Sequence, residues 1–246
     1  MKIKSKNLLL LIFFSFLVPG CTLKNRKRLT PPVSEYVKVF HRVDILSCKK
    51  GNSKNCAVGT FQTTGSGMLV DLSTKYSTGF ILTAGHVCHN ILPASIENSL
   101  QYNQVMDGDG KLHDAHMVIS SQDANRGPDL CILYAPSIKK VGVKVSLIKP
   151  RVGDQIYYIG SPAGVFHPPV APILPGIYSG EIDEHSAMIT APAVGGSSGS
   201  AILNDRNKII GVLWAAHPGF HHVTLMSNFD SFQEFLRQAR KLVNSI

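Results

Sequence analysis

Three short segments occur in a fixed order along this 246-residue chain, and each adjoins an apolar run typical of a β-strand. They are Thr-Ala-Gly-His-Val at 83–87, Pro-Asp-Leu-Cys-Ile-Leu at 128–133 and Gly-Gly-Ser-Ser-Gly-Ser-Ala at 195–201. Together they supply His86, Asp129 and Ser198, the three side chains that nucleophilic acyl transfer uses. In that chemistry a serine hydroxyl attacks a carbonyl, an imidazole takes its proton, and a carboxylate orients the imidazole. The order therefore predicts an acyl-transfer site assembled from segments far apart in the sequence.

Short β-runs separated by turn residues account for most of the chain after residue 35, without helical patterns between them. This pattern favours an all-β barrel or sandwich over a βαβ fold. Helical spacing of apolar residues appears only near the C-terminus, where Ser231-Phe-Gln-Glu reads as a capping box. The expected strands are 37–46, 67–72, 79–83, 115–120, 130–134, 143–147, 155–159, 173–182, 186–190, 201–203, 208–215 and 223–227.

At these residues the chain resembles the trypsin-like serine peptidases of the chymotrypsin fold, and it is most similar to bacterial glutamyl endopeptidases and Deg-type proteases. The order His, Asp, Ser is that of this fold and differs from the orders of subtilisins and α/β-hydrolases. The resemblance covers residues 35–243 and rests on the joint pattern, since each motif alone is common. It implies one peptidase domain at 35–246, made of two antiparallel six-stranded β-barrels and a C-terminal amphipathic helix. The implied bounds are about 35–150 and 151–228 for the barrels and 229–243 for the helix.

The resemblance also implies a role for each site residue. Ser198 is the expected nucleophile, His86 the general base and then acid, and Asp129 the orienting carboxylate. The amides of Gly196 and Ser198 are expected to form the oxyanion hole. Two other carboxylates compete for the third role, and Asp129 is preferred because it directly precedes the strand at 130–133; the competitors are Asp114 and Asp123.

Substrate specificity is implied by a further set of residues. By the resemblance, Pro192 stands where a trypsin carries the acidic residue at the bottom of its S1 pocket. Leu213 stands where glutamyl endopeptidases carry a histidine. A small or apolar P1 residue is therefore expected. Ser197 replaces the aspartate that pairs with a freed N-terminus in many relatives, which disfavours a trypsin-type zymogen switch. The residues expected to border the bound substrate are Pro192, Ala193, Val194, Gly195, Leu213, Trp214, Ala215, Ala216 and His217.

Four cysteines lie within the expected domain. Cys48 and Cys56 flank a polar segment, so a disulfide that closes a hairpin is expected there. Cys88 and Cys131 follow the candidate histidine and aspartate by two residues each, and either a second disulfide or two buried free thiols fits this placement.

The N-terminus has the features of an export signal. Lysines at 2, 4 and 6 precede an apolar run at 8–18, which is too short for a comfortable transmembrane span. The sequence Leu-Val-Pro-Gly-Cys at 17–21 resembles a bacterial lipoprotein cleavage box, which makes residues 1–21 the signal peptide and Cys21 the lipidated residue. An ordinary cysteine beside a plain cleavage site is the alternative. Residues 22–34 read as a tether, so the expected product is periplasmic or at the cell surface and anchored to a membrane.

The net charge of +9 comes mostly from this leader. Seven of the 25 Lys and Arg residues precede residue 29 and no acidic residue does, so the remainder holds 18 basic against 16 acidic residues. A nucleic-acid partner is therefore not expected. No Cys, His or carboxylate set has the spacing of a structural zinc site, and neither a metal nor a cofactor is expected.

These features together predict an exported serine endopeptidase that acts on extended polypeptide through an acyl-enzyme. A catalytically silent protein-binding module on the same fold is the first alternative, and loss of a triad residue would be its usual mark. An α/β-type esterase is the second, and its alternating helices are not indicated by this sequence.

Overall fold

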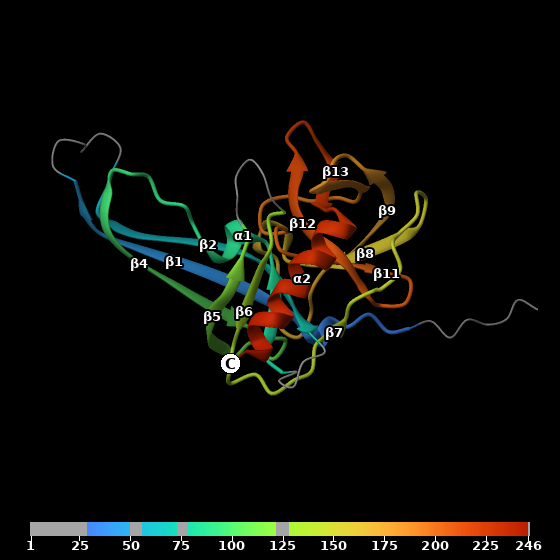
Figure 1. The fold of residues 1–246 in the computed structure, drawn as a ribbon, viewed down its shortest axis with the longest axis horizontal. Coiled ribbons are helices and arrows are strands. Elements are labelled where there is room, and N and C mark those ends of the chain that lie inside the picture. The colour runs from blue at the N-terminus through green and yellow to red at the C-terminus, as the bar shows by residue number, and fades with distance from the viewer. Residues whose placement is uncertain (1–28, 50–55, 73–77, 122–127, 246) are drawn as a thin grey trace, which may run out of the picture.

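Two sets of six antiparallel strands each close on themselves in the computed structural model, which describes residues 29–49, 56–72, 78–121 and 128–245 (Figure 1). In the first set the order is β1-β4-β5-β6-β3-β2, and β2 pairs again with β1 to close the ring. The second set closes in the order β10-β13-β12-β11-β8-β9. This confirms the predicted all-β architecture of two barrels.

The strands of the first barrel are β1 (Tyr36–Cys48), β2 (Gly59–Asp71), β3 (Phe80–Thr83), β4 (Ile96–Met106), β5 (Leu112–Ser120) and β6 (Cys131–Tyr134). A short 3-10 turn, η1 (Val33–Glu35), precedes them, and helix α1 (Gly85–Cys88) follows β3. Strand β7 (Val143–Lys144) adds to β2 in parallel. The second barrel consists of β8 (Gln155–Ile159), β9 (Ile173–Glu181), β10 (Ser186–Thr190), β11 (Ala201–Asn204), β12 (Ile209–His217) and β13 (Phe220–Ser227), with the turn η3 (Pro162–Gly164) after β8.

The core of the first barrel is continuous with part of the second. All four residues of β3 are buried, and β6 is buried over its first three, as expected for short apolar strands in the middle of a closed sheet. Their apolar side chains belong to one buried cluster that also holds residues of β11 and β12. A smaller cluster fills the rest of the second barrel. The barrels therefore share a packed interface, and the site described below lies on it.

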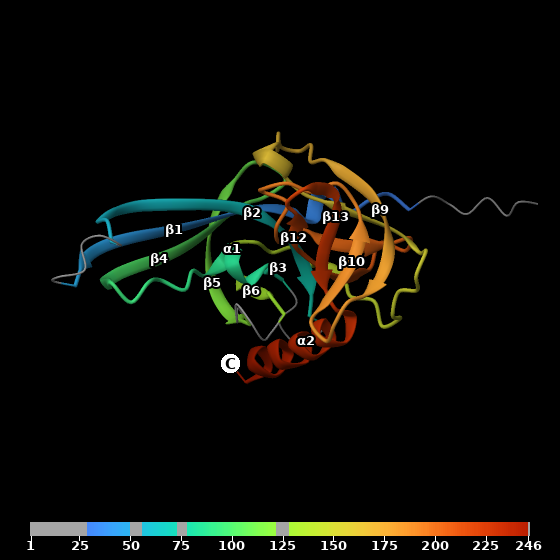
Figure 2. The ribbon, with the colours of Figure 1, turned by 90° about the horizontal axis from the view of Figure 1, so that it is seen from above.

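Strand β4 was missed by the sequence analysis, and β2 begins at Gly59 rather than near 67. The physical reason is that β1, β2 and β4 extend beyond the barrel as a three-stranded ribbon, which Figures 1 and 2 show projecting to one side. Much of β4 and residues 59–64 of β2 are exposed there. Because most of their side chains are exposed, these segments lack the apolar alternation that identifies a strand.

Helix α2 (Phe229–Asn244) packs across both barrels at the end of the chain (Figure 2). Its N-cap is Asn228, whose side chain accepts a hydrogen bond from the Asp230 N–H at 2.8 Å. The predicted capping box at Ser231 was therefore placed three residues too late, because Ser231 already lies in the first turn and donates to the Asn228 carbonyl. The apolar face of the helix belongs to the large core cluster.

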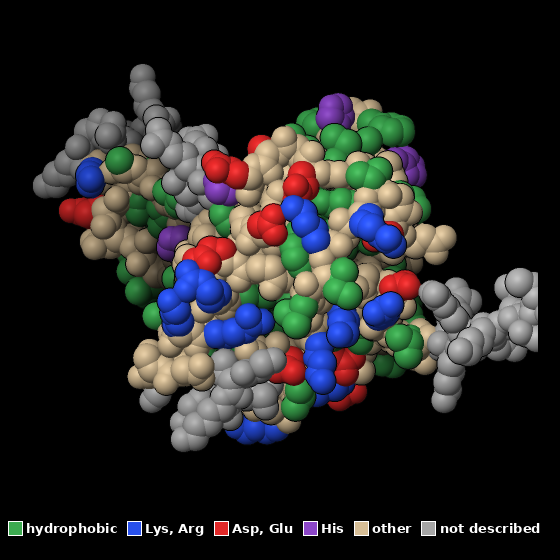
Figure 3. All heavy atoms as spheres, turned by 45° about the vertical axis from the view of Figure 1, so that its right-hand side comes forward, with side chains coloured by type: hydrophobic (Ala, Val, Ile, Leu, Met, Phe, Trp, Pro, Cys, Tyr) green, Lys and Arg blue, Asp and Glu red, His purple; other side chains and the backbone are tan. Residues whose placement is uncertain are grey.

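The predicted signal peptide at 1–21, its lipidated Cys21 and most of the predicted tether lie outside the described residues. Within the described part of the chain, no helix has the length and apolar character needed to cross a membrane. On the face shown in Figure 3, basic and acidic side chains are interspersed, which agrees with the nearly balanced charge beyond residue 28.

We expect Phe232→Ala to lower the free energy of unfolding by about 3–5 kcal/mol, because Phe232 is fully buried between the helix and the barrels. Urea denaturation followed by circular dichroism measures the loss. Gln238→Ala, on the exposed face of the same helix, is the control and should stay within about 0.5 kcal/mol of the parent. Equal effects of the two substitutions would contradict the assigned packing face.

Candidate active site

His86 and Asp129 come together between α1 and the start of β6. The His86 backbone N–H donates to Asp129 Oδ1 at 2.8 Å, and the imidazole Nδ1 is hydrogen bonded to Oδ2. Both oxygens of the carboxylate are thus engaged by one residue, which fixes the position and the orientation of the ring. With the proton held on Nδ1, the neutral imidazole carries a free lone pair on Nε2. Because 39% of the His86 side chain is exposed, that nitrogen is open to a reacting group.

A disulfide between Cys88 and Cys131 ties these two elements together. Both cysteines are buried, and each follows a member of the His86–Asp129 pair by two residues. Of the two alternatives left open by the sequence, the structure shows the bridge. A second disulfide joins Cys48 at the end of β1 to Cys56, just before β2.

The loop that carries Ser198 packs directly on the histidine turn. Gly199 has φ +87°, and a Cβ at this position would lie 2.2 Å from Thr83 Oγ1 and 3.1 Å from the Ala84 nitrogen. Only glycine permits this approach. At Gly65, an added Cβ would lie 2.6 Å from the Val87 side chain and 2.9 Å from the Ser198 carbonyl. The serine loop and the turn that holds His86 are therefore in close contact.

The hydroxyl of Ser198 donates to the Trp214 carbonyl at 3.4 Å. Within the described residues, no hydrogen bond joins it to His86. A rotation about χ1 moves a serine hydroxyl between staggered positions at low cost, and hydrogen bonds in unliganded sites are often looser than in the reacting complex. The structure thus places the serine beside the histidine with its hydroxyl turned toward β12.

Two backbone amides, those of Gly196 and Ser198, flank the buried Ser197. The Gly195 carbonyl accepts from the Ala163 N–H of η3 at 2.7 Å. Because the peptide is trans, the Gly196 N–H points away from Ala163. In the part of the chain that the structure describes, neither this N–H nor that of Ser198 has an acceptor. Each of these two groups therefore keeps its capacity to donate a hydrogen bond to an oxygen bound beside the loop.

A hydrogen-bonded network holds the segment before the serine. Tyr158 of β8 is fully buried, and its hydroxyl donates to the Pro192 carbonyl and lies 3.4 Å from Ser197 Oγ. Burial raises the pKa of Tyr158, so the phenol remains protonated and able to donate. The Val194 N–H donates to Ser197 Oγ at 3.3 Å. The sequence analysis missed Tyr158, although a buried tyrosine in a predicted strand needs a partner for its hydroxyl.

The predicted substrate-bordering residues divide into two groups. Val194, Gly195 and His217 are exposed, and Pro192, Trp214, Ala215 and Ala216 are half-buried around the serine loop and β12. The side chains of Ala193 and Leu213 are instead buried in the core of the second barrel. Only the backbone of these two residues can face a substrate, because their side chains complete the apolar interior.

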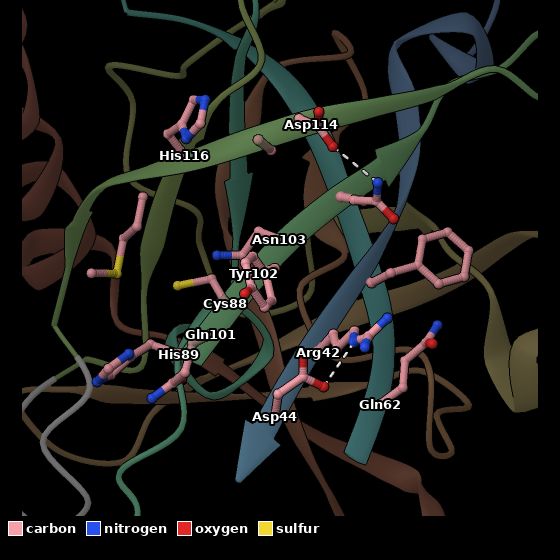
Figure 4. Close-up of a pocket in the computed structure, with 14 residues that line it drawn as sticks. Arg42, Asp44, Gln62, Cys88, His89, Gln101, Tyr102, Asn103, Asp114 and His116 are labelled. Carbon is pink, nitrogen blue, oxygen red and sulfur yellow. Dashed lines mark hydrogen bonds and ion pairs between the residues drawn. The ribbon is translucent and has the colours of Figure 1, made fainter. Parts of the chain in front are cut away.

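Asp114, a competitor of Asp129 in the sequence, lies on β5 and accepts from Gln104 of the neighbouring strand at 2.9 Å. It borders a hollow of about 900 Å³ beside the ribbon, together with Arg42, Gln62 and Cys88 (Figure 4). Asp123, the other competitor, lies outside the described residues. No group of three or more His, Cys, Asp or Glu side chains within the described ranges is arranged to hold a metal ion.

Residues 65–212 match the family described as the trypsin-like peptidase domain. No curated protein matches the chain. Among solved structures, the active form of the Rv3671c protease from M. tuberculosis has a TM-score of 0.58 at 18% identity, covering 85% of this chain and 84% of that one. The serine endoprotease from Yersinia pestis also has a TM-score of 0.58 at 18% identity, covering 85% of this chain and 64% of that one.

We expect Asp129→Asn to change the tautomer of His86 without unfolding the protein. The amide of the variant has one oxygen where the carboxylate has two, so it cannot accept from both the His86 N–H and Nδ1–H. With the amide oxygen on the backbone N–H, the NH₂ group faces Nδ1 and the ring proton moves to Nε2. Imidazole ¹⁵N NMR measures this shift. Asp114→Asn is the control, and an unchanged spectrum in Asp129→Asn would contradict the assigned geometry.

Proposed function

Since the chain belongs to the trypsin-like peptidase family, we propose that it is a serine endopeptidase that works through the triad Ser198, His86 and Asp129. The observation that carries the proposal is the two-point contact between His86 and Asp129, in a turn that packs on the loop of Ser198. If Asp129 served only to anchor the backbone of the turn, its bond to the His86 N–H would be enough. Its second bond orients the partly exposed imidazole, which supports a role for the ring in catalysis.

In the proposed mechanism Ser198 Oγ attacks the carbonyl carbon of the substrate while His86 Nε2 accepts the hydroxyl proton. The Asp129 carboxylate stabilises the imidazolium that forms. The imidazolium then gives its proton to the leaving nitrogen, which releases the amine product and leaves an ester on Ser198. Water attacks this ester with His86 again as base, which restores the free serine.

The negative charge that develops on the carbonyl oxygen is assigned to the amides of Gly196 and Ser198. Donors of this kind contribute roughly 2.7–4 kcal/mol each to transition-state stabilisation. The Ala163 N–H supports this role because it holds the Gly195 carbonyl on the opposite side of the peptide. The turn η3 thereby acts as a positioning element for the oxyanion site.

The substrate is proposed to lie extended along β12 at 214–216, with a small or apolar P1 side chain near 192–195. No charged residue lies in these two segments. The Tyr158 hydroxyl donates to the Pro192 carbonyl. Its proposed role is therefore to hold the backbone at 192–195 in position, and not to bind a charged substrate side chain.

Export is part of the proposal. Two disulfides support it, because such bridges persist in oxidising compartments and are rare in the cytosol. The leader at 1–21 has the charge and length of a signal peptide, and Cys21 is the proposed lipid attachment point. The proposed location is the periplasm or the cell surface, with the domain anchored to a membrane.

A catalytically silent protein-binding module is the second candidate. The observation that favours it is the hydrogen bond from Ser198 Oγ to the Trp214 carbonyl, which engages the hydroxyl with β12 and not with His86. Reactivity of the serine decides between the two candidates.

We expect a fluorophosphonate probe to label the protein lacking residues 1–21 and to leave its Ser198→Ala variant unlabelled. Ser200→Ala is the matched control, because Ser200 is buried two residues away and its hydroxyl has no hydrogen-bond partner in the described structure. It should label like the parent. Gel fluorescence reports the result. Labelling that survives in Ser198→Ala would overturn the assigned nucleophile, and no labelling of any protein would favour the binding module.

A further inference from the structure

The three most exposed large apolar side chains of the described residues lie together in one loop. They are Leu147, Val152 and Ile148, which are 84%, 75% and 68% exposed. This loop, residues 147–152, connects β7 to β8 and so joins the two barrels. Scattered exposed apolar residues are ordinary, whereas a cluster of them on one protrusion indicates contact with a second apolar phase.

The exposure of these side chains is fixed by hydrogen bonds at both ends of the loop. Ser146 is buried, and its Oγ donates to the Ile148 carbonyl at 3.0 Å and accepts from the Ile148 N–H at 3.1 Å. At the other end, the Arg151 N–H donates to Asp154 Oδ2 at 2.9 Å. The backbone is therefore held in two turns that direct the apolar side chains outward.

Basic groups lie among the apolar ones. The side chain of Arg151 is exposed, and its guanidinium is 3.8 Å from the Asp154 carboxylate. Lys149 forms ion pairs with Glu181 at 2.6 Å and with Asp230 at 2.7 Å, so the charge of the neighbouring carboxylates is partly compensated. A long basic side chain beside apolar ones can keep its stem in an apolar layer and its charge among phosphates.

The loop lies near the point at which the described chain begins. The Asn207 side chain donates to the Thr30 carbonyl at 2.6 Å, and the Ile209 carbonyl accepts from the Ser146 N–H at 2.8 Å. One hairpin, between β11 and β12, thus contacts both the start of the described chain and the base of the loop. Figure 1 shows this start at the end of the molecule opposite to the ribbon.

The sequence before this point favours a membrane as the occupant. Residues 24–28 are Lys-Asn-Arg-Lys-Arg, and basic residues in such a position are attracted to anionic lipid surfaces. From the proposed lipid attachment point Cys21 to Leu29, even a fully extended chain spans no more than about 28 Å. A lipid on Cys21 would therefore keep this end of the domain close to a bilayer.

We propose that the loop at 147–152 docks onto the surface of a lipid bilayer, with Leu147, Ile148 and Val152 inserted below the headgroups and Arg151 beside their phosphates. A short protruding loop fits a deformable lipid surface, whereas a protein partner needs a matching pocket. The inference rests on the membrane location given in the proposed function, and it does not require peptidase activity. Docking at this end leaves the ribbon in solvent.

The first experiment measures sedimentation with vesicles of phosphatidylethanolamine and phosphatidylglycerol. It uses the protein lacking residues 1–21, which contains every described residue and carries no lipid, so that the loop acts without the anchor. We expect the parent to bind and Leu147→Ser with Ile148→Ser to bind roughly tenfold to a hundredfold more weakly, because two inserted side chains are lost.

The matched control is Val58→Ser with Ile91→Ser, which removes two comparably exposed apolar side chains outside the loop. It should bind vesicles like the parent. Melting temperatures of all three proteins are recorded, and they should agree because every substituted side chain is exposed.

The second experiment detects insertion directly. Tryptophan emission shifts to shorter wavelength in an apolar environment, and bromine on the lipid chains quenches it on contact. We expect vesicles of brominated lipid to quench the emission of Ile148→Trp. Ile91→Trp and the parent, whose one tryptophan is Trp214, should show no such quenching.

Each other result would overturn the inference. No binding by the parent, or equal losses in the two double variants, would show that the loop does not dock. Binding that about 0.5 M NaCl abolishes and that Leu147→Ser with Ile148→Ser leaves unchanged would assign it to residues 24–28 alone. A dimer in sedimentation velocity that the same double variant dissociates, without vesicle binding, would assign the loop to a second copy of the chain.

These outcomes are separate from those of the proposed function. Labelling of Ser198 by the fluorophosphonate probe reports the peptidase, and radiolabelled fatty acid on Cys21 reports the anchor. Vesicle binding by the protein without residues 1–21 reports the loop and depends on neither.

Discussion

The two-point contact between Asp129 and His86 is the interaction on which the rest of the site depends. One carboxylate oxygen holds the backbone of the α1 turn and the other holds the imidazole, so the position of the turn and the direction of the ring are set together. The carboxylate stands at the start of a buried strand, and the Cys88–Cys131 disulfide joins that strand to α1. The first barrel therefore holds the imidazole in place, and the second barrel brings the serine loop against the turn that carries it.

The serine loop is set by contacts from both barrels. Glycine at 199 lets the loop approach Thr83 of the first barrel, and the Ala163 N–H of the second holds the peptide before Gly196. Helix α2 packs on a core cluster to which both barrels contribute, so the relative position of the barrels is a property of the interior. Proposed catalysis thus rests on packing that lies far from the reacting atoms.

Periodicity was sufficient to predict an all-β chain with a C-terminal helix, because it depends on local pattern. The two barrels were predicted from the family resemblance that the three ordered motifs carry. Periodicity could not predict β4, because much of this strand is exposed and its apolar residues do not alternate regularly with polar ones. Leu213 was expected to border the bound substrate, whereas its side chain is buried inside the second barrel. Tyr158 and Ala163 act through contacts with the loop at 192–196, and such long-range contacts leave no periodic trace in the sequence.

The central claim is that Ser198 carries a covalent acyl intermediate, and mass spectrometry of an acid-quenched reaction with a p-nitrophenyl ester tests it most directly. The account predicts an acyl group on the peptide that contains Ser198, formed within the first turnover and lost when the protein is returned to neutral pH. An acyl group that resides on another residue, or a protein that turns over the ester without any acylated peptide, would contradict it.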